Sequence, residues 1–79
     1  MARLRSLMAG TQSVKVHPTE VDCFYQTVLD NNGRKILHLT TFGSDGRQSN
    51  PKSSQSIQLD ERSARALVRI IKETFDIAD

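Results

Sequence analysis

The residues of this chain best suited to chemistry are four cationic side chains in its polar turns. Lysine and arginine in such turns can pair with phosphate oxygens, so they favour electrostatic binding to a nucleic-acid backbone. The alternative is that basic turns only keep a small protein soluble. The four candidates are Arg34, Lys35, Arg47 and Lys52.

The first pair of cations follows one turn and the second pair flanks the next, so they are predicted to lie at opposite ends of the strand between them. At about 3.3 Å per residue, that strand separates them by about 25 Å, which suits several nucleotides better than one phosphate. Phe42 or Tyr25 could stack on a base, although both rings could also belong to the core. Polar candidates for hydrogen bonds to bases are His38, Thr40, Gln55 and Gln58.

Patterns typical of catalytic and metal sites are missing from the sequence. His17 and His38 have no carboxylate at a motif spacing, and His17 with Cys23 is an unsupported metal-binding pair. No glycine-rich phosphate loop precedes a helix, and no serine lies in a nucleophile elbow. We therefore predict a non-enzymatic protein that needs no metal or other cofactor. The single cysteine, Cys23, excludes an internal disulfide and fits a reducing compartment.

The candidate residues are predicted to lie on a small sheet. Residues 20–30 are rich in β-branched and aromatic side chains, which predicts a strand. The Asn-Asn-Gly sequence at 31–33 predicts a tight antiparallel hairpin to a second strand at 35–42. Residues 55–59 predict a third strand, and Val14 to His17 is a candidate edge strand.

Alternation of side chains along these strands predicts one packed face and one polar face of the sheet. The packed face is predicted to hold Leu37, Leu39, Thr41, Ile57 and Leu59. The opposite face is predicted to hold Ile36, His38, Thr40, Phe42, Ser54, Ser56 and Gln58.

An amphipathic helix is predicted to follow the last strand and to run to about Phe75. Asp60 is its expected N-cap, because a carboxylate can accept hydrogen bonds from the free amides of the first turn. A second apolar line on the helix, Ala66 and Ile70, has nothing in a single chain to cover it, so we predict a homodimer that forms through the helix. The alternative is that these residues are singly exposed, which is common. The arc expected to pack on the sheet comprises Ala64, Leu67, Val68, Ile71 and Phe75.

Length and composition predict one small α+β domain, with an antiparallel sheet of three to four strands followed by one C-terminal helix. A chain of 79 residues buries only about 60% of its unfolded surface, which again favours a partner subunit. The net charge of +2 is too small to identify a nucleic-acid binder by itself. Residues 1–13 are predicted to be a flexible basic arm and residues 14–79 the domain. No apolar run approaches the about 20 residues of a membrane span, so we expect a cytoplasmic protein with no membrane partner.

Several segments, taken in order, resemble the positive cofactor four family of transcriptional coactivators. The resemblance implies a homodimer that joins through its helices and binds single-stranded or melted DNA along its sheets, largely without sequence preference. In this resemblance Lys35 matches a basic residue at the start of a strand, Arg47 and Lys52 match a cationic loop, and Ile57 and Leu59 match the core side of the last strand. The matching segments are Gly33-Arg34-Lys35-Ile36-Leu37-His38-Leu39, Asp45-Gly46, Asn50-Pro51-Lys52, Ser56-Ile57-Gln58-Leu59-Asp60-Glu61 and the terminal helix.

Two functions are therefore expected from the sequence. The first is a sequence-nonspecific protein that binds single-stranded DNA or RNA as a transcription or replication cofactor. The second is a protein-binding adaptor or regulator, of bacterial or phage origin, that uses the polar sheet face or an open strand edge to recruit a partner.

Overall fold

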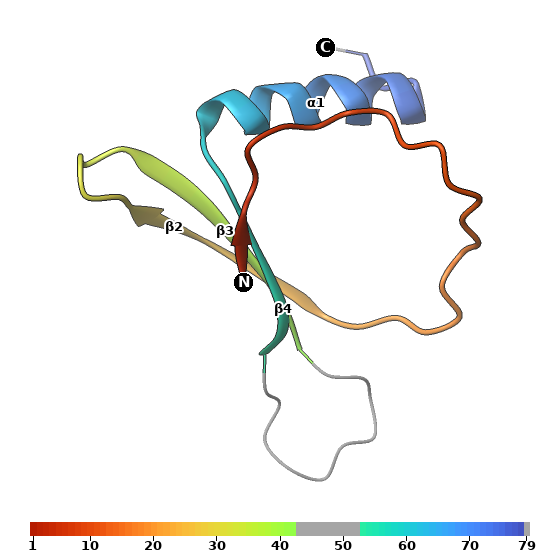
Figure 1. Ribbon diagram of the computed structural model, residues 1–79, viewed down its shortest axis with the longest axis horizontal. Coiled ribbons are helices and arrows are strands. Elements are labelled where there is room, and N and C mark those ends of the chain that lie inside the picture. The colour runs from red at the N-terminus through yellow and green to blue at the C-terminus, as the bar shows by residue number, and fades with distance from the viewer. Residues whose placement is uncertain (43–52, 79) are drawn as a thin grey trace, which may run out of the picture.

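The computed structural model describes residues 1–42 and 53–78 and has an α+β architecture, with a sheet and one C-terminal helix (Figure 1). The predicted second strand and the predicted helix are confirmed at both ends, and the first and third predicted strands are confirmed with shifted ends. The elements are β1 (Ala2–Arg3), β2 (Cys23–Leu29), β3 (Lys35–Phe42), β4 (Ser53–Leu59) and α1 (Glu61–Phe75).

The hairpin between β2 and β3 is the predicted antiparallel one. Gly33 has a φ of 78°, which an L side chain rarely adopts, so glycine is required at this position of the turn. The carboxylate of Asp30 accepts hydrogen bonds from the backbone N–H groups of Asn32 at 2.8 Å and Arg34 at 2.9 Å. These bonds favour the charged form, so they lower the pKa of Asp30.

The sheet has four strands in the order β1-β4-β3-β2 and is mixed. The prediction of a purely antiparallel sheet is wrong, because β1 pairs with β4 in parallel, Ala2 with Ile57 and Arg3 with Gln58. The fourth strand is therefore β1, whereas the segment at 14–17 forms no strand.

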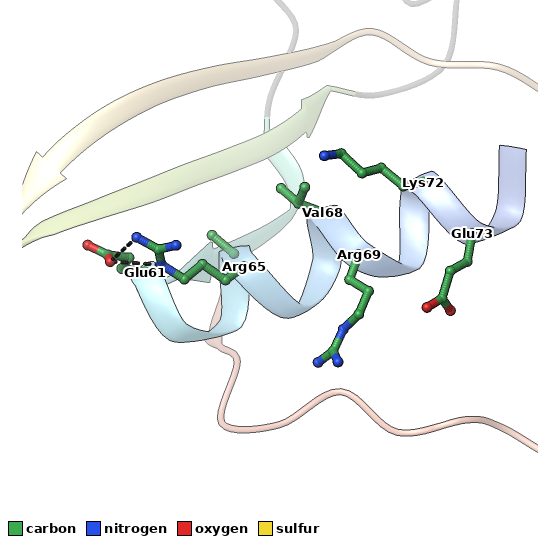
Figure 2. A pocket seen from close by; sticks show the side chains of 7 residues that line it. Glu61, Arg65, Val68, Arg69, Lys72 and Glu73 are labelled. Carbon is green, nitrogen blue, oxygen red and sulfur yellow. Dashed lines mark hydrogen bonds and ion pairs between the residues drawn. The ribbon is translucent and has the colours of Figure 1, made fainter. Parts of the chain in front are cut away.

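The start of the segment that the sequence predicts to be a flexible arm is tied to the fold. The N–H of Leu4 donates to the carbonyl of Gln58 at 2.9 Å, and the Ser63 hydroxyl donates to the Leu4 carbonyl at 3.4 Å. The chain after β1 then runs beside α1 in both views (Figures 1 and 2). A strand of two residues has no periodicity for sequence reasoning to detect, which explains the difference.

The register of the sheet confirms the predicted separation of its two faces. Leu37 pairs with Leu59 and Leu39 with Ile57, so these apolar side chains share one face. On the other face the pairs are His38 with Gln58 and Thr40 with Ser56. Two assignments were wrong in their burial. Ile36, expected on the polar face, is only 3% exposed, and Ile57, expected on the packed face, is 37% exposed. Leu37 and Leu39 are half-buried. At its end of the sheet, Ile36 lies in a groove between the hairpin and the start of α1, where neighbouring side chains cover it.

The buried core of the described chain is very small. Its apolar members are Ile36 and Leu59, and Ser63 of α1 is the buried polar residue. The helix contacts β3 and β4, but its C-terminal half extends beyond the strands (Figure 1). The expectation that the whole apolar arc packs on the sheet is therefore wrong. Ala64 and Leu67 are half-buried, whereas the remaining members of the arc are exposed, namely Val68, Ile71 and Phe75.

Asp60 is the N-cap of α1, as predicted, and its carboxylate accepts from the Ser63 N–H at 2.9 Å. At the other end Asp76 adopts the left-handed conformation, with φ 55°, and closes the helix with a hydrogen bond from the backbone N–H of this residue to the Lys72 carbonyl. The Ser63 hydrogen bond is the main cause of a lowered pKa at Asp60, and Arg3 and Arg62 contribute through their charges.

Acid is expected to destabilise this fold through the two lowered carboxyl pKa values. Each carboxylate stabilises the folded state at pH values above its ordinary pKa of 3.8, and this contribution is lost as the pH falls through the lowered folded-state value. Asp60→Asn should keep the cap and weaken this acid dependence, because asparagine caps well but does not titrate there. Asp60→Ala should lower the thermal midpoint most at neutral pH, and the difference from wild type should shrink as the pH falls. Thermal unfolding by circular dichroism between about pH 2 and pH 7 tests both variants, and equal midpoints for wild type and Asp60→Ala at neutral pH would contradict the assigned cap.

Candidate nucleic-acid interface

The polar face of the sheet carries cross-strand hydrogen bonds between side chains. The Gln58 amide nitrogen lies 3.0 Å from His38 Nδ1, and the Thr40 and Ser56 hydroxyl oxygens are 3.0 Å apart. An amide nitrogen can only donate, so Nδ1 of His38 accepts this bond and the N–H of the ring lies on Nε2. This Nε2 N–H has no partner within the described parts of the chain, and it can donate to a ligand.

The same face carries a pair of aromatic rings. Phe24 and Phe42 have ring centroids 4.9 Å apart and an interplanar angle of 58°. Phe24 reaches this face because it pairs with Thr40 across β2 and β3. Phe24 is 61% exposed, whereas large aromatic side chains are usually well buried. An exposed ring beside hydrogen-bonding groups is the arrangement on which a nucleic-acid base can stack.

Two further polar residues extend the row that contains His38. Gln26 of β2 pairs with His38, and Arg3 of β1 pairs with Gln58, so all four side chains belong to the polar face. Sequence reasoning missed both residues, and it also missed Phe24. The alternation of β2 could have assigned Phe24 and Gln26 to this face once the hairpin register was known. No local pattern could have placed Arg3.

The structure brings together only some of the predicted binding residues. His38, Thr40 and Gln58 lie on the polar face. Gln55 pairs with Thr41 and lies on the opposite face. Lys35 alternates with Ile36 and also belongs to that opposite face, and Arg34 leaves the hairpin turn beside it. Arg47 and Lys52 lie outside the described residues.

A groove at the hairpin end of the sheet concentrates charged side chains. It lies between the hairpin and the first turns of α1, and its walls include Ile36 and Leu59. Backbone hydrogen bonds from Arg34 and Ser63 are the main causes of the lowered pKa values of Asp30 and Asp60, and the charge of Arg3 adds to both. The cations of this groove are Arg3, Arg34, Lys35, Arg62 and Arg65, and its acids are Asp30, Asp60 and Glu61.

A second groove follows α1 and is lined by both charged and apolar side chains (Figure 2). Arg65 forms an ion pair with Glu61 at 2.9 Å, as the spacing of these residues predicts. Both side chains are more than three-quarters exposed, so this pair contributes little to stability. Val68 and Lys72 point to one side of the helix, and Arg69 points away from them (Figure 2). The apolar residues of this groove are Ala64 and Val68, and Val68 is 49% exposed, so no part of the described chain covers it fully.

The structure gives no sign of a metal site or a membrane span in the parts that it describes. No group of three or more histidine, cysteine or acidic side chains gathers in residues 1–42 and 53–78. Within the same ranges, no helix combines the length and apolar character needed to cross a membrane. Comparisons with models of known families, with curated proteins and with solved structures gave no match for this chain.

Proposed function

We propose that this protein is a homodimer that binds single-stranded nucleic acid on the polar face of its sheet, without sequence preference. The observation that carries the proposal is the ring pair of exposed Phe24 and half-buried Phe42, which shares a face with the hydrogen-bonded pair of His38 and Gln58. Stacking accepts any base, because every base has an aromatic face, and amide or imidazole groups can bond to base edges. The resemblance to the positive cofactor four family supports the same function.

The nucleic-acid backbone would be neutralised by cations at the two ends of the sheet. Arg3 of the polar face and Arg34 of the turn line the charged groove at the hairpin end, whereas Lys35 lies on the opposite face of the sheet. Arg47 and Lys52, which lie outside the described residues, are expected from the sequence to supply the cations of the other end. Phosphate contacts of this kind would set the register of the strand on the sheet, and the rings would hold its bases.

The dimer in this proposal forms through the exposed apolar side of α1. A seam of Ala64, Val68, Ile71 and Phe75 has alternate spacings of four and three residues, the pattern of paired helices. In an antiparallel pair the smallest residue, Ala64, would face the largest, Phe75, and Val68 would face Ile71, so volumes match along the seam. A parallel pair would place Phe75 against Phe75.

The predicted interface residues, Ala66 and Ile70, lie beside this seam. Ala66 is half-buried within the single chain, and Ile70 is 42% exposed. They would border the helix contact rather than form its centre. Covering the seam would bury apolar surface that a single chain with such a small core leaves in water.

The test of this function is a titration of labelled single-stranded and duplex oligonucleotides at several salt concentrations. If a dimer neutralises about four to eight phosphates, log K should fall with log salt at a slope of about −3 to −6. Tighter binding to single strands with this slope supports the proposal. A flat salt dependence, or a preference for the duplex, contradicts it.

The adaptor function is the second candidate, and the uncharged open edge of β2 favours it. An adaptor of this kind would not bind oligonucleotides. Charge reversal at Arg47 and Lys52 separates the two candidates, because it should weaken nucleic-acid binding strongly and leave the capture of a protein partner nearly unchanged.

A further inference from the structure

The outer edge of β2 carries an inference that goes beyond nucleic-acid binding and does not depend on it. β2 is the last strand in the sheet order, so one of its sides pairs with β3 and the other pairs with nothing in the described chain. Its seven residues read Cys-Phe-Tyr-Gln-Thr-Val-Leu. They include no charge, no proline and no glycine. Natural edge strands normally carry such residues to prevent pairing with another chain.

The hydrogen bonds of the hairpin show which backbone groups are free. The Asp30 N–H donates to the Arg34 carbonyl at 2.9 Å, and the Phe42 N–H donates to the Asp22 carbonyl at 3.2 Å. In an antiparallel ladder every second residue directs its N–H and C=O to the same neighbour, so the even-numbered residues of β2 bond to β3. The odd-numbered residues direct their backbone groups outward, namely Cys23, Tyr25, Thr27 and Leu29.

We propose that this edge pairs with β2 of a second copy of the chain, antiparallel about a two-fold axis at Gln26. All outward groups would then find partners, because Tyr25 would face Thr27 of the other copy and Cys23 would face Leu29. All four residues are odd-numbered and direct their N–H and C=O groups away from β3, as hydrogen-bonded pairs across this edge require. Moving the axis to another residue of β2 would leave some of these outward-facing groups unpaired and shorten the ladder.

The side chains also suit this symmetric pairing. On one face Phe24 would lie opposite Val28, and on the other Tyr25 would lie opposite Thr27. Each pair joins an aromatic residue to a β-branched one, a combination that stabilises sheets. Phe24, Tyr25 and Leu29 are 61%, 77% and 67% exposed in the single chain, so each has surface to bury. Gln26 would meet Gln26 at the axis, where the two amides can hydrogen-bond.

The pairing would join two sheets into one. The polar row of Gln58, His38 and Gln26 would continue into the same row of the second copy, so a nucleic-acid strand bound as proposed would meet a platform of doubled length. The contact uses β2 and leaves the α1 seam free. A chain with two different two-fold contacts can form assemblies larger than a dimer.

Disulfide trapping tests the position of the axis. In a background where Cys23 is replaced by serine, Gln26→Cys would bring two thiols to the axis, where facing Cα atoms lie about 4.5 Å apart, within the range of a disulfide. Leu29→Cys is the matched control, because the two copies of that residue would be separated by about 20 Å. We expect oxidised Gln26→Cys protein to run as a covalent dimer and Leu29→Cys to remain mostly a monomer on a non-reducing gel.

A proline variant provides a second test. Thr27→Pro removes an N–H that points away from β3, so it should spare the hairpin and reduce trapping at Gln26→Cys, whereas Thr27→Ala should not. Trapping should persist when α1 carries Ile71→Glu and when oligonucleotide binding fails, so this contact can be judged separately from the proposed function. Equal trapping of Gln26→Cys and Leu29→Cys, or trapping that Thr27→Pro leaves unchanged, would overturn the inference.

Discussion

Replacing Phe24 with alanine is expected to weaken binding to single-stranded oligonucleotides by about 5- to 150-fold, which corresponds to about 1 to 3 kcal/mol for one base stacked on an aromatic ring. Phe24 is 61% exposed, and its ring contacts the ring of Phe42 on the same polar face. Removing the ring should therefore reduce oligonucleotide affinity much more than it reduces the stability of the fold. Fluorescence anisotropy at a fixed salt concentration measures the change.

The neighbouring residue provides a matched control for this variant. Tyr25 is an aromatic residue of the same strand, and it is 77% exposed, but it pairs with Leu39 and lies on the opposite face. Tyr25→Ala should change oligonucleotide affinity by less than about twofold, since a residue on the other face cannot stack on the same strand. Equal losses for Phe24→Ala and Tyr25→Ala would show that the polar face is not the binding surface.

Ile71→Glu is expected to separate the proposed helix-paired dimer. Ile71 is 39% exposed in the single chain and lies in the middle of the seam, opposite Val68 in the antiparallel arrangement. A carboxylate there would have to be buried without a partner, which costs far more than one apolar contact contributes. The mutation should leave the single chain folded, because the seam is exposed to water before association.

Sedimentation at micromolar concentration measures this effect. To isolate the helix contact from the β2 contact, both proteins should carry Thr27→Pro. The parent should then sediment at twice the chain mass of 8.9 kDa, and the Ile71→Glu variant at the mass of one chain. Arg69→Gln is the control, since Arg69 points away from Val68 and should keep the dimer (Figure 2). A parent that sediments as a single chain would rule out pairing through α1.

Local sequence determined most of the individual elements. The glycine turn and the Asp60 cap follow from interactions within a few residues, and the alternating, β-branched and apolar composition of β3 is visible in the sequence directly. The division of the sheet into an apolar and a polar face also follows, because side chains alternate along any strand. On that basis His38, Thr40 and Gln58 could be selected together before the register was known.

Tertiary structure decided which of these surfaces meet. The parallel pairing of β1 with β4 joins segments that are far apart in the sequence, Ala2 with Ile57, and no local pattern reports such a contact. The burial of Ile36 and the exposure of Val68, Ile71 and Phe75 depend on where α1 leaves the sheet, whereas periodicity defines only the sides of a helix. The hairpin register likewise brings Phe24 beside Phe42, because the two rings come from different strands and meet only when those strands are aligned.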